Sequence, residues 1–181
     1  MAQVFLGMSG GVDSSAAAVL LQEQGYAVSG LHLSLLSGLP LPADRLPDDG
    51  SDARAVASLL GLPFYDMDLS PEFRATVIDY FIREYEAGRT PNPCVFCNRR
   101  IKFGAMWDAA QKLGADYLAT GHYAKIRQDP ATGRHLLCRG ADPSKDQSYF
   151  LCRLTQEQLS RTLFPLGDLE KPAVRALAEA H

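Results

Sequence analysis

A glycine-rich turn near the start of the chain constrains the fold more than any other feature. Residues 4–8 form a short apolar run, residues 7–15 read Gly-Met-Ser-Gly-Gly-Val-Asp-Ser-Ser, and the alanine-rich residues 16–21 favour a helix. Glycines between a strand and a helix N-terminus let backbone N–H groups approach an anion, which the helix dipole also attracts. The sequence therefore predicts a phosphate-binding turn in an α/β protein.

This turn differs from the two best-known phosphate-binding patterns. It has neither the Gly-Lys-Ser/Thr of a Walker A loop nor Gly-x-Gly-x-x-Gly spacing. It does contain Asp13, and a carboxylate beside phosphates makes chemical sense mainly as a ligand of Mg²⁺. The alternative is a glycine-rich turn with a serine cap and no ligand. The full run from Ser9 to Ser15 between a strand and a helix favours the binding site.

Strands and helices alternate along the rest of the chain, which predicts an open parallel sheet with helices on both faces. Further strands are expected at 27–35, 63–69 and 117–123. Helices are expected at 51–60, 70–88 and 98–113, with a loop at 38–50 and an irregular segment at 89–97. Residues 124–128 and 134–138 predict a hairpin, and helical pieces follow from about residue 144.

Composition excludes several classes of protein. The 181 residues carry a net charge of −3, which is no global signature of nucleic-acid binding, so an RNA-binding role needs a local basic patch. No apolar run is long enough to span a bilayer, and the first residues do not resemble a signal peptide. We therefore expect a cytoplasmic protein without a membrane partner, whose four cysteines are reduced unless they react or bind a metal.

Cys94 and Cys97 lie three residues apart, behind two prolines. We expect Cys97 at or just before a helix N-terminus, where the dipole and nearby basic side chains would favour its thiolate. Those basic residues could also meet an RNA backbone. They are Arg99, Arg100 and Lys102.

Other interpretations of this cysteine pair remain open. It could be half of a zinc site, although a second ligand pair is missing from the sequence. A thioredoxin-like motif would require its own βαβ context. Two incidental structural cysteines are a better description of Cys138 and Cys152 than of a pair in a proline-bracketed segment.

Several sequence blocks carry a resemblance to a known family. They are 7–15, 88–93, 97–103, 114–123, 145–151 and 163–167. The first block resembles the PP-loop ATPases, which cleave ATP between its α and β phosphates and adenylate a carbonyl or amide oxygen. Together the blocks resemble the N-terminal catalytic portion of the tRNA-specific 2-thiouridylases.

The resemblance implies a domain organisation. The expected fold is the PP-loop fold, similar to the adenine nucleotide alpha hydrolases, with a small hairpin and a truncated helical C-terminal extension. Residues 1–150 would form the ATP-binding catalytic domain. Residues 151–181 would be the helical start of a missing central tRNA-binding region.

The resemblance also implies roles for individual residues. The expected ATP-binding residues are Gly7, Met8, Ser9, Gly10, Gly11, Val12, Asp13, Ser14, Leu33 and Gly121. Cys97 matches the nucleophile, and Asp13 is expected to hold Mg²⁺ and take part in catalysis. Residues matching the stretch that faces the target base are Asn92, Pro93 and Cys94. Those matching tRNA contacts are His122, Lys145, Asp146 and Gln147.

The implied reaction is ATP-dependent 2-thiolation of the wobble uridine of tRNA. ATP adenylates the uridine 2-oxygen, and sulfur from a cysteine persulfide, supplied by a donor protein, then displaces AMP. Cys94 stands where the family commonly has Asp, which favours a redox partnership with Cys97 or ligation of a 4Fe–4S cluster by Cys94, Cys97 and a third cysteine. The family's second catalytic cysteine lies beyond His181, so we expect this chain to be incomplete for the full reaction.

Two alternatives to this function remain. One is a PP-loop sulfur or amide transferase that acts on another RNA position or on a small molecule. The other is a nucleotide-binding module without catalytic activity.

Overall fold

The protein is described by a computed structural model, which places residues 1–38 and 49–181. Within these ranges a five-stranded parallel sheet has the order β3-β2-β1-β4-β7. Its strands are β1 (Gln3–Gly7), β2 (Ala27–Ser34), β3 (Phe64–Asp68), β4 (Tyr117–Thr120) and β7 (Thr162–Leu163). The predicted parallel sheet is therefore confirmed. Most of the loop expected at 38–50 lies outside the described residues.

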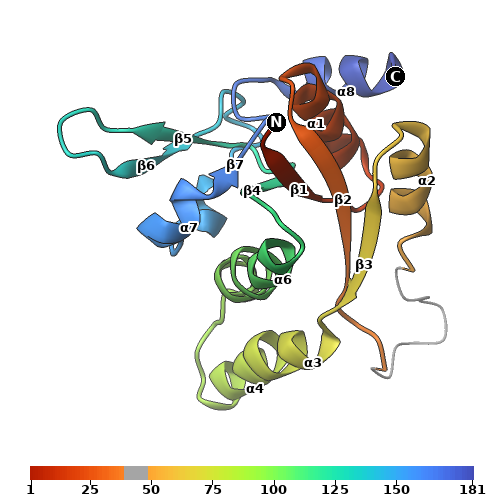
Figure 1. Cartoon of the computed structure of the whole chain (residues 1–181). Coiled ribbons are helices and arrows are strands. Elements are labelled where there is room, and N and C mark those ends of the chain that lie inside the picture. Colours follow the sequence, from red (N-terminus) through yellow and green to blue (C-terminus); the bar gives the residue numbers. More distant parts are fainter. Residues whose placement is uncertain (39–48) are drawn as a thin grey trace.

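Helices cover both faces of the sheet, as predicted (Figure 1). One face carries α1 (Val12–Glu23), α2 (Ser51–Leu59) and α8 (Lys171–Glu179). The other carries α3 (Ser70–Phe73), α4 (Asp79–Glu86), α5 (Pro93–Cys97) and α6 (Met106–Lys112). Residues 74–78 join α3 to α4, and residues 98–105 join α5 to α6, as π-helical segments.

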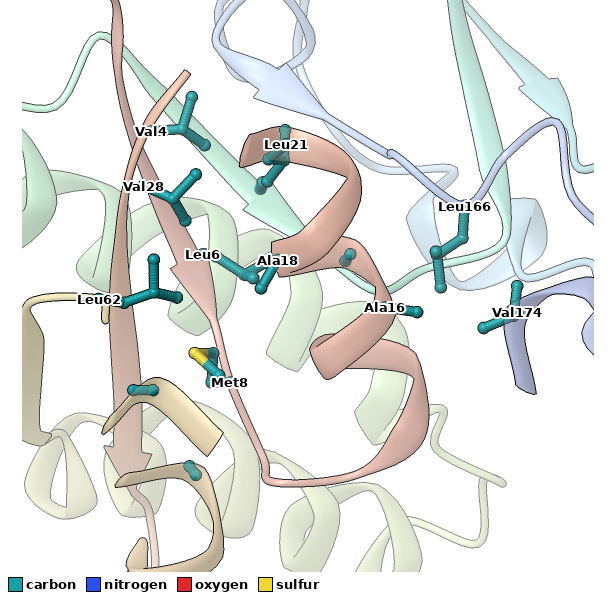
Figure 2. Close-up of a cluster of buried hydrophobic side chains, with 14 of the residues drawn as sticks. Val4, Leu6, Met8, Ala16, Ala18, Leu21, Val28, Leu62, Leu166 and Val174 are labelled. Atoms are coloured by element: carbon teal, nitrogen blue, oxygen red, sulfur yellow. The ribbon is translucent and has the colours of Figure 1, made fainter. Parts of the chain in front are cut away.

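Successive side chains of β1 point to opposite faces of the sheet and so belong to two separate core clusters. Val4 and Leu6 pack with α1 on one face, whereas Phe5 packs with the helix containing Phe103 on the other. All four of these side chains are almost fully buried. Figure 2 shows the first cluster, in which alanines on α1 let the helix approach β1 and β2 closely. This two-sided burial holds the turn after β1 at the carboxyl edge of the sheet.

The structure corrects three sequence predictions. Residues 89–97 are not wholly irregular, because α5 begins at Pro93 and continues through the π-helical segment into α6. The fourth strand ends at Thr120 rather than at Tyr123. The short strand β7 was missed, since two residues are too few to show a period-2 pattern.

The hairpin is confirmed as β5 (Ala124–Gln128) paired with β6 (His135–Arg139). The remaining helix, α7 (Gln156–Ser160), precedes β7. A division of the chain at residue 150 stays a prediction, but residues 151–181 are not only helical. They add β7 to the main sheet, and Leu166 and Val174 are buried in the α1 cluster.

Candidate functional site

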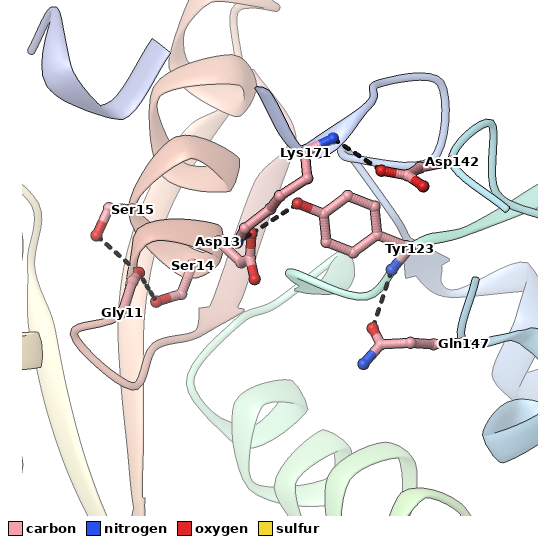
Figure 3. Close-up of polar contacts among 8 residues, drawn as sticks. All are labelled: Gly11, Asp13, Ser14, Ser15, Tyr123, Asp142, Gln147 and Lys171. Carbon is pink, nitrogen blue, oxygen red and sulfur yellow. Dashed lines mark hydrogen bonds and ion pairs between the residues drawn. The ribbon is translucent and has the colours of Figure 1, made fainter. Parts of the chain in front are cut away.

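The turn between β1 and α1 is held in shape by its own serines. The Ser14 hydroxyl donates to the Gly11 carbonyl at 3.0 Å and accepts from the Ser9 N–H at 3.3 Å. The Ser15 hydroxyl donates to the same carbonyl at 3.1 Å (Figure 3). The hydroxyls of Ser14 and Ser15 therefore brace the loop itself. This bracing fixes the backbone before any anion binds.

Gly10 is the loop position that requires glycine. Its φ of +74° lies in the left-handed region, and a Cβ there would lie 2.4 Å from the Cβ of Asp52 on α2. Gly121, after β4, approaches the first turn of α1, where an added Cβ would lie 3.1 Å from the Asp13 carbonyl carbon. The loop is thus packed closely against neighbours on both sides.

A cavity of about 350 Å³ opens beside this loop, at the carboxyl ends of β1, β2 and β4. Ligands bind in this position in open α/β sheets. One end is formed by the loop, and the other by apolar side chains of β2 and α6. The predicted residues that line it are Gly7, Met8, Ser9, Asp13, Ser14, Leu33, Gly121, His122 and Gln147. Gly10, Gly11 and Val12 belong to the loop without lining the cavity.

The Asp13 carboxylate is engaged by two side chains that sequence reasoning missed. Its Oδ1 accepts a hydrogen bond from the Tyr123 hydroxyl at 2.7 Å and one from Lys171 Nζ at 2.6 Å. Burial and the neighbouring Asp13 raise the pKa of Tyr123, so its hydroxyl keeps the proton it donates. Asp13 is the one carboxylate among the cavity-lining residues of the described chain. Since Mg²⁺ often uses one protein carboxylate together with phosphate oxygens, this donor set fits the ion.

His122 is a buried, neutral imidazole at the cavity wall. Burial, with a smaller effect of Lys102, lowers the pKa of His122 to about 3. Its Nδ1 shares a 2.6 Å hydrogen bond with the Thr120 hydroxyl, and its ring lies 6.0 Å from those of Phe103 and Phe164. The expected tRNA contact of His122 would therefore be a neutral hydrogen bond rather than a charge contact.

Cys97 does not lie at a helix N-terminus. It is the last residue of α5, inside a helix that continues to Lys112, and its side chain packs against the second core cluster. Burial raises the pKa of the Cys97 thiol, although Lys102 opposes this shift. The expected stabilisation of its thiolate is therefore wrong for this conformation, because desolvation outweighs the nearby positive charge.

The N-terminus of α5 is formed by the residues expected to face the target base. The Asn92 side chain caps the helix by accepting from the Val95 N–H at 3.3 Å, and Pro93 is the first helical residue. Cys94 follows and is exposed. The four cysteines are all described, yet residues 1–38 and 49–181 contain no group of three or more His, Cys, Asp or Glu side chains that could hold a metal. Cys94 and Cys97 therefore do not form a three-ligand iron–sulfur site with residues placed here.

The three residues Lys145, Asp146 and Gln147 have different surroundings. Lys145 is exposed. The Asp146 carboxylate accepts from the Gly140 N–H at 3.0 Å and from the Ser148 hydroxyl at 2.8 Å, so it shapes its own loop. Gln147 Oε1 accepts from the Tyr123 N–H at 3.1 Å, and this residue lines the cavity.

Lys102 is close to both the cavity and Cys97. It lines the cavity, and its charge acts on both Cys97 and His122. The sequence marked Lys102 only as a basic neighbour of Cys97. Nothing in the sequence marked Lys171, which is 158 positions from Asp13. Within the described part of the chain, no helix has the length and apolar character needed to cross a membrane.

Curated proteins resemble this chain over most of its length. The tRNA-specific 2-thiouridylase MnmA of Lactococcus lactis subsp. cremoris (strain MG1363) is 52% identical over 178 residues, which are 98% of this chain and 47% of that protein. The protein of the same name from Christiangramia forsetii is 51% identical over 183 residues, covering 98% of this chain and 46% of its own. The chain thus spans about half the length of these curated relatives.

Solved structures share the fold at low sequence identity. The U34-tRNA thiolase NcsA from Methanococcus maripaludis with its [4Fe-4S] cluster has a TM-score of 0.58 at 21% identity, covering 98% of this chain and 55% of that one. The NMN synthetase from Francisella tularensis has a TM-score of 0.53 at 18% identity, covering 98% and 60%. A family model described as the tRNA methyl transferase HUP domain matches residues 2–181. The chain therefore belongs to the tRNA methyl transferase HUP domain family.

Proposed function

We propose that this chain is the nucleotide-binding half of a tRNA-uridine 2-sulfurtransferase. The observation that carries the proposal is the cavity at the carboxyl edge of the sheet, with the braced anion loop at one end and apolar side chains at the other. ATP fits both ends of this cavity, because its phosphates can bind at the loop and its adenine can pack against the apolar side chains. The curated relatives named 2-thiouridylases support the substrate and the reaction class.

ATP would bind with its phosphates at the N-terminus of α1. Backbone N–H groups of the loop and the α1 dipole favour the negative charge there. Leu31, Leu33 and Met106 would surround the adenine. A Mg²⁺ ion bound through Asp13 would neutralise charge on the departing pyrophosphate.

The tRNA side of the site would extend from the cavity toward α5. Lys102 lines the cavity and is near enough to Cys97 for its charge to act on that thiol, so a uridine adenylated beside Lys102 would lie near Cys97. Asn92, Pro93 and Cys94 would approach the target base, and Arg99 and Arg100 would meet the RNA backbone. His122, Lys145, Asp146 and Gln147 are the further tRNA contacts we propose, with Asp146 acting by shaping its loop.

Sulfur transfer would follow adenylation. The terminal sulfur of a Cys97 persulfide, loaded by a donor protein, attacks C2 of the uridine, and AMP leaves with the former 2-oxygen. The resulting disulfide between Cys97 and the base is broken by a second thiol, which attacks Cys97 and releases the 2-thiouridine. Because the Cys97 side chain is partly buried against the second core cluster, we expect tRNA docking to rearrange α5 before this step. We place the reaction in the cytoplasm, with residues 1–150 as the catalytic domain and 151–181 leading toward further tRNA-binding structure.

Methyl transfer, which the family description mentions, fits the cavity less well. The common methyl donor S-adenosylmethionine carries no phosphate, so only its single carboxylate could meet the anion loop.

Pyrophosphate release tests the proposal directly. ATP should be cleaved to AMP and pyrophosphate in a tRNA-dependent reaction, measured on this chain and on a protein of its relatives' full length. Asp13→Asn should abolish release, whereas Cys97→Ser should retain it and abolish thiolation in the longer protein. If both proteins bind ATP and neither turns it over in a tRNA-dependent reaction, the assignment is refuted in favour of a binding module.

A further inference from the structure

Three segments far apart in the chain meet at one carboxylate oxygen. Asp13 Oδ1, in the first turn of α1, accepts from the Tyr123 hydroxyl and from Lys171 Nζ. Figure 3 shows Tyr123 reaching from the segment after β4 to Asp13, with Lys171 arriving from the start of α8. The Lys171 backbone N–H is itself anchored by Asp142 Oδ2 at 3.0 Å.

The stability of α8 does not account for this lysine. Lys171 is the first residue of α8, where the helix dipole disfavours a positive charge. Its side chain is only 19% exposed, so ordering it has a conformational-entropy cost, and a partly exposed pair with Asp13 returns little stability. The placement makes sense if Lys171 has a second partner at the site.

We infer that Lys171 binds phosphate oxygens of the nucleotide, and that Asp13 holds it in position while the phosphates are absent. This inference rests on the proposed ATP site. Lys171 Nζ is one hydrogen bond from Asp13, which lines the cavity at its loop end. When Lys171 turns to a phosphate, Tyr123 still donates to Asp13, so the carboxylate keeps a partner. Lysine is well suited to this role as a point charge on a flexible stem.

A different role would be electrostatic only: Lys171 could neutralise Asp13 and never touch the nucleotide. The two roles differ in a double variant. If neutralisation were the whole function, Asp13→Asn with Lys171→Met would restore wild-type affinity, because no charge would remain to neutralise. If Lys171 contacts phosphate, the double variant stays weak.

The experiment measures the affinities of ATP, pyrophosphate and adenosine by titration calorimetry, with EDTA present so that no divalent cation contributes. Lys171→Met should weaken ATP and pyrophosphate about 10- to 100-fold, as expected for one charged hydrogen bond, and leave adenosine unchanged. Lys171→Arg should recover most of the loss. Lys112→Met removes an exposed cation at the end of α6, outside the cavity lining, and should leave all three affinities within about twofold.

Each outcome decides the question. Wild-type ATP affinity in Lys171→Met, or full recovery in the double variant, overturns the inference. Equal loss of adenosine binding in Lys171→Met, with no rescue by Lys171→Arg, also overturns it, because the role would then be structural. Failure of the wild-type chain to bind ATP both in EDTA and with Mg²⁺ added would instead refute the proposed function.

Discussion

The phosphate loop and the cysteine segment belong to one site but differ in how ready they are for chemistry. The loop is braced by Ser14 and Ser15, requires glycine at position 10 and borders a formed cavity. In the cysteine segment, Cys97 is partly buried, with a pKa raised by desolvation, while Cys94 is exposed two residues after the Asn92 cap. The phosphate loop is preorganised, whereas the cysteine segment holds the Cys97 thiol in its protonated, less reactive form.

This difference suggests an order of events. Under the proposed function, a site that binds ATP without rearrangement but must change shape before sulfur transfer would adenylate first and expose its thiol only when tRNA is bound. Such an arrangement would protect the persulfide from competing thiols.

The largest effect is expected from Gly10→Ala. The substitution forces a left-handed alanine against Asp52 and the backbone of α2, which should cost about 2 to 5 kcal/mol of unfolding free energy and abolish measurable ATP binding. Chemical unfolding and calorimetry measure both effects. Gly25→Ala is the matched control, because Gly25 has φ +82° but no atom within 4 Å of an added Cβ. An ATP affinity unchanged in Gly10→Ala would show that the loop is not preorganised.

His122 is buried at the cavity wall and should make the free energy of unfolding depend on pH. Its folded pKa of about 3 is below the ordinary value of 6.5, so the neutral form stabilises the fold above pH 6.5. This stability is lost as the pH falls from 6.5 toward 3, since the unfolded chain binds the proton first. Between pH 8 and 5 the loss should be about 2 kcal/mol. Urea unfolding of His122→Asn should lack this component, and an identical pH slope in wild type and variant would contradict the assignment.

Alkylation should separate the two cysteines. Cys94 is exposed near the helix N-terminus and should react with iodoacetamide roughly tenfold faster than Cys97 at neutral pH. Because its pKa is raised, Cys97 should gain reactivity only at higher pH in the folded protein. Mass spectrometry in a Cys138→Ser, Cys152→Ser background gives both rates. Urea should remove the difference, and equal rates in the folded chain would show that Cys97 is already accessible.

The sequence predicted the loop better than the cysteine segment, for a physical reason. The loop consists of consecutive residues whose glycines and serines interact locally, so the order of residues almost determines its geometry. The reactivity of Cys97 depends instead on burial among side chains from distant segments, which a local pattern does not encode. Basic neighbours suggested a thiolate, but desolvation proved the larger effect.

The same distinction explains the other misses. The helix start at Pro93 was hidden because prolines suggested irregular structure, although proline is favoured in the first turn of a helix. Lys171 and Tyr123 reach Asp13 only through tertiary packing, so no spacing rule marks them. The parallel sheet and its covering helices were predictable because alternation of strands and helices repeats along the chain.

The smallest expected effect concerns Asn92, the N-cap of α5. Asn92→Ala removes the side chain that accepts from the Val95 N–H and should lower the unfolding free energy by about 1 kcal/mol, whereas Asn92→Asp keeps an acceptor and should stay close to wild type. Cys94 is already exposed in the folded chain, so fraying of the first turn should change its alkylation rate little. Cys97 lies deeper in the same continuous helix, so its alkylation rate should also stay near the wild-type value. A clear rise in the alkylation rate of Cys97 in Asn92→Ala would mean that the whole helix, rather than its first turn, opens.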